Sequence, residues 1–435
     1  MMWYLCLGDI MTKIDLKEIS KSFLPPYIKN YDNFDANKDN VLYGGPYWDH
    51  NEINAILESV LTGDWIVSGS KVEKFQEEFG NKFNVKYCHM VNSGSSANLV
   101  NIAALKKRFR WNDNDEIIVS PVGFPTTIAP IVQNKLVPKF IDIEFDTLNF
   151  DVNLIEAAIT KKTKAIIVSP VLGNPPDMDK IKQICDDNGL LCIGDNCDSL
   201  GTLYNGKHLS DYYYSWSCSF YPAHHISTGE GGMVCSNDQH LIDLARSISW
   251  WGRDCYCVGA NNTLSCGTCG KRFDYWLENY DGIIDHKYVY GNMGYNLKPL
   301  DLQGAVGSVQ MTKVDEICKK RRYNKEFIEQ KLVEHIGIVP VKVFKNADPS
   351  WFGVPIVCRK QGEKELLVAH FESNKIQTRN YFGGNILLHP AYKHLGDYKK
   401  FPNANKVLDN VFFLGCSPLY NDKVLSYIEE VIKKW

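Results

Sequence analysis

Short apolar runs alternate with amphipathic stretches along most of the chain. The runs have the length of buried strands, and the stretches between them, such as residues 95–109 and 176–189, carry apolar residues at helical spacing. This alternation predicts an α/β domain built on a mostly parallel, buried sheet. The seven predicted strands lie at residues 87–91, 116–120, 139–143, 164–169, 190–195, 213–220 and 231–236.

The same pattern divides the chain into parts. Residues 1–50 contain turn signals and are expected to form an N-terminal arm, followed by a large α/β domain at 51–300. Residues 301–335 predict one long connecting helix, and residues 336–435 suit a smaller α+β domain. Within the large domain, residues 251–298 are rich in Gly, Cys, Asn and Tyr, which is typical of a functional or metal-anchored loop.

Composition narrows the class of protein. Hydrophobic residues make up 44% and charged residues 23%, as in ordinary globular proteins, and the net charge of −3 argues against a nucleic-acid or anionic-membrane partner. No apolar run approaches the ~20 residues of a membrane helix. The first residues are apolar but interrupted by Asp9, which makes a poor signal peptide. We therefore expect a cytoplasmic location.

Three motifs follow predicted strands and could bind a ligand. In "NSGSSAN", Gly94 permits an unusual turn, and Ser95 with the free N–H groups of a helix start suits an anion, although simple helix capping is the commoner meaning. Phe124 of "GFPTT" would stack on a planar ligand or pack in the core. Asp195 of "GDNCDS" would cap a helix or pair with a positively charged heteroatom. Neither a Walker lysine motif nor a dinucleotide fingerprint accompanies them.

The segment "SFYPAHHISTGEGGMV" (219–234) predicts a strand, a turn and a glycine-rich return. The turn carries two adjacent histidines, His224 and His225, and no lysine. Imidazole transfers protons near neutral pH but cannot attach a carbonyl cofactor as an amine does. Taken alone, His224 is either a proton-transfer group or a packed histidine.

Together these motifs resemble a known family. The ordered set SGSSA, GFPTT, GDNCDSLG, SFYPAHH, GEGG, GYNLK and RNYFGGN resembles the DegT/DnrJ/EryC/StrS sugar aminotransferase and dehydratase group of fold-type I pyridoxal-phosphate proteins, over about residues 40–435. Within this group the chain is most similar to the CDP-4-keto-6-deoxyglucose 3-dehydrases, which use pyridoxamine phosphate and an iron–sulfur cluster to make 3,6-dideoxysugars. The resemblance implies a fold-type I aminotransferase-like large domain and a homodimer.

The resemblance also implies how the cofactor is held. Asp195 would pair with the pyridinium nitrogen of the cofactor, and Phe124 would stack on its ring. Gly94, Ser95 and Ser219 would hold its phosphate.

A second group of residues would serve catalysis and the substrate. The resemblance places His224 where related aminotransferases carry the reactive lysine, so it would take a proton from the cofactor methylene carbon and favour dehydration over amino transfer. His225, Arg379 and Asn385 would contact the sugar nucleotide. Asn296 of "GYNLK" would reach the cofactor phosphate of the neighbouring subunit.

Four cysteines, Cys255, Cys257, Cys266 and Cys269, lie within fifteen residues. Their spacing fits an all-thiolate zinc site as well as an iron–sulfur cluster. The resemblance implies a [2Fe–2S] cluster with Cys197, Cys255, Cys257 and Cys269 as ligands, and the eleven residues between Cys257 and Cys269 leave Cys266 a rival.

The cluster implies a redox partner. Dehydration leaves an unsaturated sugar that needs two electrons to become a 3-deoxysugar. The chain has no flavin or nicotinamide motif, so a separate NADH-dependent flavin/iron–sulfur reductase would supply them.

The sequence therefore predicts a pyridoxamine-phosphate- and [2Fe–2S]-dependent 3-dehydrase of a nucleotide-linked 4-keto-6-deoxyhexose. CDP is the expected nucleotide, with dTDP as an alternative. The rival functions are a cluster-free dehydratase similar to those acting on GDP-4-keto-6-deoxymannose and a non-catalytic metal or redox sensor. An aminotransferase would need another lysine, and Lys207 and Lys271, the nearest in sequence, lie outside the required motif.

Overall fold

A seven-stranded sheet forms the centre of the large domain, with the strand order β1-β9-β8-β5-β4-β2-β3. Strand β9 is antiparallel to both of its neighbours, and the other six strands all run in one direction. The mostly parallel seven-stranded sheet expected from the sequence is confirmed. The strands are β1 (Tyr87–Val91), β2 (Glu116–Val119), β3 (Val137–Phe140), β4 (Thr163–Val168), β5 (Leu191–Asp195), β8 (Ser215–Ser219) and β9 (Gly232–Ser236). The structure, a computed structural model, describes residues 16–22, 28, 31–63, 66–254, 273 and 275–435.

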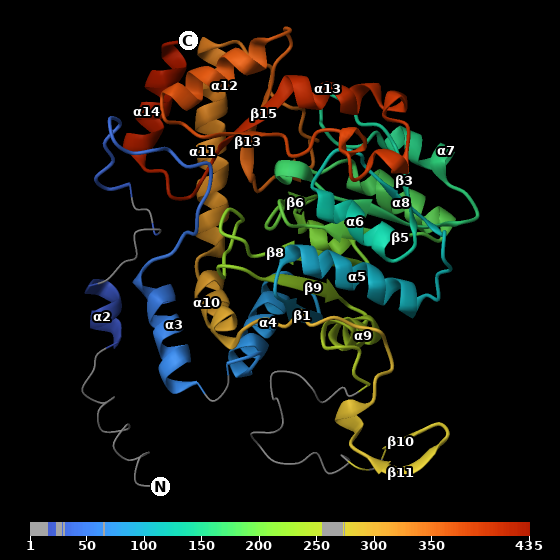
Figure 1. Ribbon diagram of the computed structural model, residues 1–435. Helices are drawn as coiled ribbons and strands as arrows, with labels where there is room; N and C mark the ends of the chain where they lie inside the picture. Colours follow the sequence, from blue (N-terminus) through green and yellow to red (C-terminus); the bar gives the residue numbers. More distant parts are fainter. Residues whose placement is uncertain (1–15, 23–27, 29–30, 64–65, 255–272, 274) are drawn as a thin grey trace.

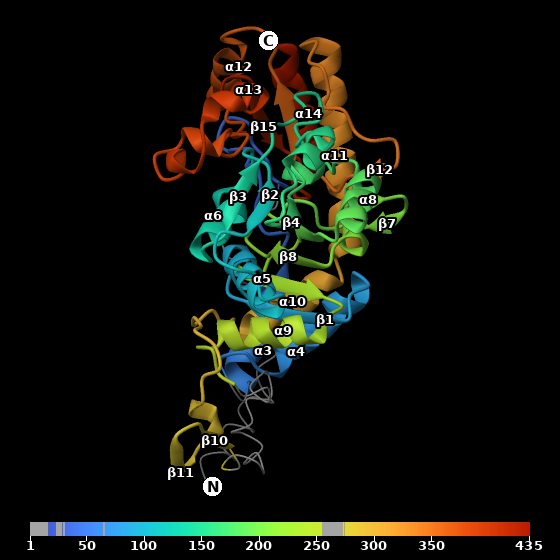
Figure 2. The same ribbon diagram turned by 90° about the vertical axis from the view of Figure 1, so that its right-hand side faces the viewer.

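Helices cover both faces of this sheet, as Figure 2 shows with α6 on one side and α8 on the other. Successive strand residues point to opposite faces, so Ile117 joins the core under α5 and α6 whereas Ile118 joins the core under α4 and α8. Burial on both faces explains why the strands are nearly continuous apolar runs. The covering helices are α4 (Ser70–Lys82), α5 (Gly94–Arg108), α6 (Pro125–Gln133), α8 (Met178–Asn188) and α9 (Gln239–Ser249).

The predicted helix 301–335 is two helices, α10 (Asp301–Met311) and α11 (Val314–His335). The Thr312 hydroxyl donates to the carbonyl of Val309 at 2.7 Å, and the Lys313 ammonium lies 2.7 Å from the buried carboxylate of Glu52. These side-chain bonds favour ending the first helix. Helix α11 then runs from the part that contains the central sheet to residues 336–435, which the sequence predicts as a smaller domain and which we call the small domain (Figure 1).

The small domain contains an antiparallel sheet with the order β13-β15-β14. The described part of the N-terminal arm packs against it, because Val41 exchanges backbone hydrogen bonds with Lys375 and Gln377. This contact places the arm near the junction of the two domains. The elements of the small domain are β13 (Gly353–Val357), β14 (Thr378–Asn380), β15 (Val411–Gly415), α12 (Glu363–Ser373), α13 (Pro402–Asn410) and α14 (Asp422–Lys433).

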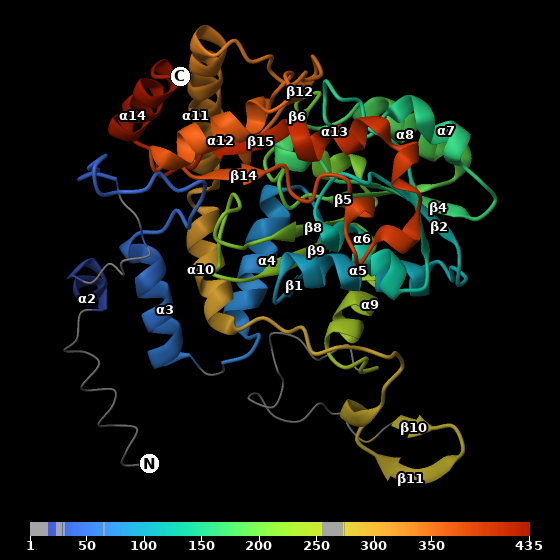
Figure 3. The same ribbon diagram turned by 45° about the horizontal axis from the view of Figure 1, so that its top comes forward.

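The remaining elements lie at the periphery. A hairpin of β10 and β11 extends from the end of the molecule opposite the small domain (Figures 1 and 3). Within the described ranges no helix is long and apolar enough to cross a membrane. The peripheral elements are α2 (Leu16–Ser22), α3 (His50–Thr62), α7 (Ile155–Ala158), β6 (Leu203–Tyr204), β7 (Lys207–His208), β10 (Tyr275–Leu277), β11 (Tyr280–Ile284) and β12 (Ala347–Asp348).

Candidate active site

A cavity of about 450 Å³ opens where the carboxyl ends of five aligned strands meet. The loops that follow β1, β2, β4, β5 and β8 all emerge at this edge, which is the usual ligand position in such sheets. The small domain and the N-terminal arm supply the rest of the wall. The lining residues used below are Tyr43, Gly94, Ser95, Phe124, Asp195, Cys197, Asp198, Ser219, Tyr221, His224, Phe352 and Phe382.

The start of α5 forms one end of the cavity. The Ser93 hydroxyl caps the helix by accepting the N–H of Ser96 at 3.1 Å, and Gly94 and Ser95 face the cavity. A Cβ on Gly94 would lie 2.4 Å from the Cβ of Ser219, so only glycine allows this close approach of α5 to β8. The structure brings the three predicted phosphate residues together at a helix N-terminus, which suits an anion.

Asp195 lies at the end of β5 and is 6% exposed. Its Oδ2 accepts hydrogen bonds from Asn98 Nδ2 at 2.9 Å and from the Thr127 hydroxyl at 2.6 Å. The Asn98 side chain is in turn held by the hydroxyl of Ser217 on β8. Two donors on different helices thus fix this carboxylate in the cavity wall.

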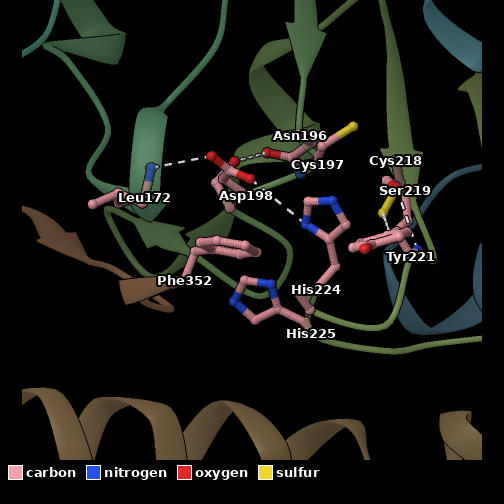
Figure 4. A network of polar contacts seen from close by, with 12 residues as sticks. Leu172, Asn196, Cys197, Asp198, Cys218, Ser219, Tyr221, His224, His225 and Phe352 are labelled. Atoms are coloured by element: carbon pink, nitrogen blue, oxygen red, sulfur yellow. Dashed lines mark hydrogen bonds and ion pairs between the residues drawn. The ribbon is translucent and has the colours of Figure 1, made fainter. Parts of the chain in front are cut away.

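His224 lies in the turn after β8 with its ring in the cavity (Figure 4). Its Nδ1 is 3.6 Å from a carboxylate oxygen of Asp198, which is a contact rather than a hydrogen bond. Its ring centroid is 5.1 Å from that of Phe352. Burial, with a smaller contribution from the charge of Arg321, lowers the pKa of His224 to about 3. The imidazole is therefore held in its neutral, proton-accepting form.

Asp198 faces this imidazole from the loop after β5. Its other oxygen accepts the N–H of Leu172 at 3.3 Å, and Leu172 has a left-handed backbone with φ of 55°. Burial, together with a smaller contribution from the negative charge of Asp195, raises the pKa of Asp198 to about 7. A strained residue and a carboxyl group with a raised pKa beside a buried imidazole are typical of a functional site.

None of the three predicted substrate residues is part of the cavity lining, although Arg379 lies against Tyr43 at its rim. His225 is 1% exposed, and its Nε2 lies 2.9 Å from the carbonyl oxygen of Ser350, on a different side of the turn from His224 (Figure 4). Asn385 is fully buried, where it bonds to Asn405 and caps Leu387. Their contacts are those of residues that support the local structure.

The rim of the cavity is aromatic. Phe124 is 51% exposed and meets Phe382 edge-on at 5.8 Å between ring centroids. The guanidinium of Arg379 lies 4.2 Å from the ring centroid of Tyr43, which reaches the rim from the N-terminal arm. These surfaces suit planar rings, and Arg379 adds a positive charge nearby.

Asn296 and the predicted metal ligands lie in different places. Asn296 is exposed, accepts a hydrogen bond from Lys298 and lies outside the cavity of its own chain. Cys197 lines the cavity beside Asp195. The described residues contain no cluster of three or more candidate metal ligands. The other predicted ligands and their rival, Cys255, Cys257, Cys269 and Cys266, lie outside the described residues, as does Lys271.

Several cavity residues are absent from the sequence prediction. Asp198 lies three positions after Asp195 in the same motif, so its acidic side chain was a usable signal. Phe382 lies inside the RNYFGGN motif, which was also a usable signal, whereas Phe352 and Tyr43 lie outside the motifs of the sequence analysis. Among the described residues that line the cavity there is no lysine.

The sheet order and the cavity at the strand ends define an aminotransferase-like α/β protein of fold type I. The likeness extends from the fold to the amino-acid sequence. The chain belongs to the DegT/DnrJ/EryC1/StrS aminotransferase family, whose sequence profile matches residues 48–433.

Similar proteins include several sugar 3-dehydratases. The chain is 37% identical to a dTDP-4-dehydro-2,6-dideoxy-D-glucose 3-dehydratase of Saccharopolyspora spinosa, over 92% of this chain and 88% of that protein. It is 36% identical to the lipopolysaccharide biosynthesis protein RfbH of Salmonella typhimurium, over 87% of each chain. Among solved structures, the Escherichia coli GDP-4-keto-6-deoxy-D-mannose 3-dehydratase with bound hydrated PLP superposes with a TM-score of 0.79 at 28% identity, covering 91% of this chain and 100% of that one.

Proposed function

We propose that this protein is a 3-dehydrase of a nucleotide-linked 4-keto-6-deoxyhexose that uses pyridoxamine phosphate and a [2Fe–2S] cluster, with CDP as the nucleotide and dTDP as the alternative. One observation carries the proposal: the neutral imidazole of His224 lies in a cavity whose described lining contains no lysine. Such a group can move a proton but cannot anchor the cofactor or exchange its amino group. The relatives named as 3-dehydratases support C3 of the sugar as the reacting position.

The residues of the cavity fit pyridoxamine phosphate. The end formed by Gly94, Ser95 and Ser219 suits a phosphate because a side chain at Gly94 would fill the cradle. The Asp195 carboxylate, fixed by Asn98 and Thr127, suits a protonated ring nitrogen. Phe124 offers an exposed ring in the same cavity lining.

Gly94→Ala should weaken the binding of pyridoxamine phosphate by about tenfold or more. The added Cβ would lie 2.4 Å from Ser219 Cβ, and relieving such overpacking costs about 1–3 kcal/mol. A spectral titration of cofactor-free protein measures the dissociation constant. Gly45→Ala is the control, because its Cβ would meet only Leu419 at 3.4 Å. Equal affinity of both variants would contradict a phosphate site at the start of α5.

When bound, pyridoxamine phosphate supplies an amine that condenses with the sugar ketone and a conjugated ring that accepts an electron pair. His224 would take the proton from the cofactor methylene carbon, and the hydroxyl at C3 would leave with a proton as water. Asp195 would hold the proton on the ring nitrogen. Phe124 and Phe352, both in the cavity lining, would help to exclude water from the site.

The oligomer and the substrate contacts follow the same reasoning. Asn296 is exposed and outside its own cavity, as expected of a residue that serves the cofactor phosphate of a second subunit in a homodimer. Arg379 beside Tyr43 is positioned at the rim to meet the diphosphate of the sugar nucleotide.

The cluster would deliver electrons to the dehydrated sugar. Cys197 reaches the cavity beside the proposed cofactor, so a cluster that it shares with Cys255, Cys257 and Cys269 would lie within electron-transfer reach. Because each cluster carries one electron at a time, a separate NADH-dependent flavin/iron–sulfur reductase would reload it. Two electrons and two protons would then be taken up, one proton at carbon 3 of the sugar and the other at the cofactor methylene carbon.

Cys197→Ser should remove most of the iron and acid-labile sulfide from anaerobically purified protein, because a serine oxygen is a poor substitute for a thiolate ligand. Iron and sulfide analysis measures the loss. Cys88→Ser is the control, since Cys88 contacts Cys235 at 3.6 Å on β1 and β9, away from the cavity lining. Wild-type protein without iron and sulfide would favour the cluster-free rival.

That rival is a dehydratase of the GDP-4-keto-6-deoxy-D-mannose type, to which the chain is 31% identical over 89% of its length. Incubation with the CDP-, dTDP- and GDP-linked 4-keto-6-deoxy sugars, pyridoxamine phosphate and a generic reductase decides between them. Mass analysis should show loss of oxygen from the CDP or dTDP sugar. Turnover of the GDP sugar alone, without need of a reductase, would support the rival, and no turnover at all would support a non-catalytic sensor.

A further inference from the structure

One arginine joins the histidine turn to the small domain. Arg321 lies in α11 and is 0% exposed. Its Nη2 donates to the carbonyl oxygens of Ala223 and His224 at 2.8 and 2.9 Å. Its Nη1 donates to the carbonyl oxygens of Phe352 at 3.1 Å and Trp351 at 3.4 Å. A single guanidinium thus bridges the turn after β8 and the segment that enters β13.

Burying the Arg321 charge costs folding free energy, so its contacts are expected to serve a purpose. A buried guanidinium normally pairs with a carboxylate, yet no described carboxylate forms an ion pair with Arg321. Instead the planar group uses both terminal nitrogens on backbone carbonyls, which a lysine ammonium cannot span in the same way. Its Nε has no hydrogen-bond partner among the described residues, which adds to the cost.

The two segments that Arg321 joins both supply walls of the cavity. His224 comes from the turn, and Phe352 comes from the small domain, with their ring centroids 5.1 Å apart (Figure 4). The positions of the two backbone segments that Arg321 binds decide where the rings of His224 and Phe352 point. A displacement of about 1 Å at a reacting group can cost about 10²-fold in rate.

We propose that Arg321 is a positioning residue for the reaction, which holds the His224 imidazole against Phe352 and over the carbon whose proton it takes. The inference rests on the proposed function, because it assumes that His224 is the base. It concerns the alignment of the base, and not the binding of cofactor or substrate.

The test compares Arg321→Lys with Arg322→Lys. Arg322 is the next residue of α11, but it points to the partly exposed side, where it bonds to Asp348 and Gly201. In Arg321→Lys, kcat and the rate of solvent hydrogen exchange at the cofactor methylene should fall by about 10- to 100-fold. The KM for the keto sugar and the dissociation constant of pyridoxamine phosphate should stay within about threefold, and Arg322→Lys should match the wild type.

A second measurement does not depend on activity. In cofactor-free protein labelled on histidine, the NMR signal of the His224 ring, assigned by its loss in His224→Asn, should shift in Arg321→Lys and stay in place in Arg322→Lys. An unchanged signal together with unchanged kcat would overturn the positioning role.

The outcomes separate this inference from the proposed function. If the wild type shows no exchange at the methylene carbon, the proposed function fails. If the wild type exchanges and Arg321→Lys does so equally fast, only the positioning role fails. Should Arg321→Lys not fold, Arg321→Gln, which keeps two donors, replaces it. Failure of both variants to fold would mean that Arg321 is only structural, which also overturns the inference.

Discussion

Replacement of His224 by asparagine is expected to lower solvent hydrogen exchange at the methylene carbon of pyridoxamine phosphate by about 10²- to 10⁴-fold, the usual contribution of a general base. Asparagine is smaller than histidine and keeps a polar side chain, but its amide is not a base. Cofactor binding should change little, because the phosphate and ring contacts lie on other elements. Exchange is followed by NMR or mass spectrometry in deuterated water, with the keto sugar present.

The matched control is His240→Asn. His240 is an exposed residue in the first turn of α9 and is not among the residues that line the cavity. It should leave both exchange and turnover at the wild-type level. Exchange in His224→Asn at the wild-type rate would remove the imidazole from the reaction and with it the central part of the proposed function.

Asp195→Asn is expected to weaken cofactor binding by about 10- to 100-fold, because a hydrogen bond to a charged group is worth about 1.5–3 kcal/mol. The loss in turnover should be larger than the loss in binding, since a neutral amide no longer stabilises the proton on the ring nitrogen. In the wild type, Asn98 and Thr127 both donate to one oxygen of the Asp195 carboxylate. The asparagine amide would present either its oxygen or its NH₂ group to these two donors. Titration of the cofactor spectrum and kcat at saturating cofactor separate the two effects.

Asp187→Asn is the control for this change. Asp187 is exposed on α8 and bonds only to Gln183 among the described hydrogen bonds. It should bind cofactor and turn over substrate as the wild type does. If Asp195→Asn matched Asp187→Asn in both cofactor affinity and kcat, the Asp195 carboxylate would have no role toward the cofactor ring.

Much of the scaffold could be predicted from local pattern. Each predicted strand corresponds to a strand of the central sheet, because burial on both faces requires continuous apolar runs. Gly94 and Ser95 could be named because glycine and serine at a helix start have a direct local meaning, whereas Ser219 followed only from the family resemblance. The sequence predicts residues 301–335 as one helix, because the break at Thr312 depends on side-chain bonds that no local pattern shows. The Thr312 hydroxyl bonds to the Val309 carbonyl, and the next residue, Lys313, bonds to Glu52 in α3.

The surroundings of His224 could not be predicted in the same way. His224 and His225 are adjacent in sequence, and no local pattern tells which ring enters the cavity. The structure directs His224 inward and turns His225 toward Ser350. Phe352, which packs on His224, lies 128 positions further along the sequence.

The sequence by itself determined the alternation of strands and helices, the helix start that suits a phosphate, and the replacement of lysine by histidine, because each depends on residue type and short spacing. Only the tertiary structure decided which histidine faces the cavity, that Asp198 lies beside it, and that Arg321 ties its turn to the small domain. These contacts join segments far apart in the chain, and they form only when strand order and domain packing bring the segments together.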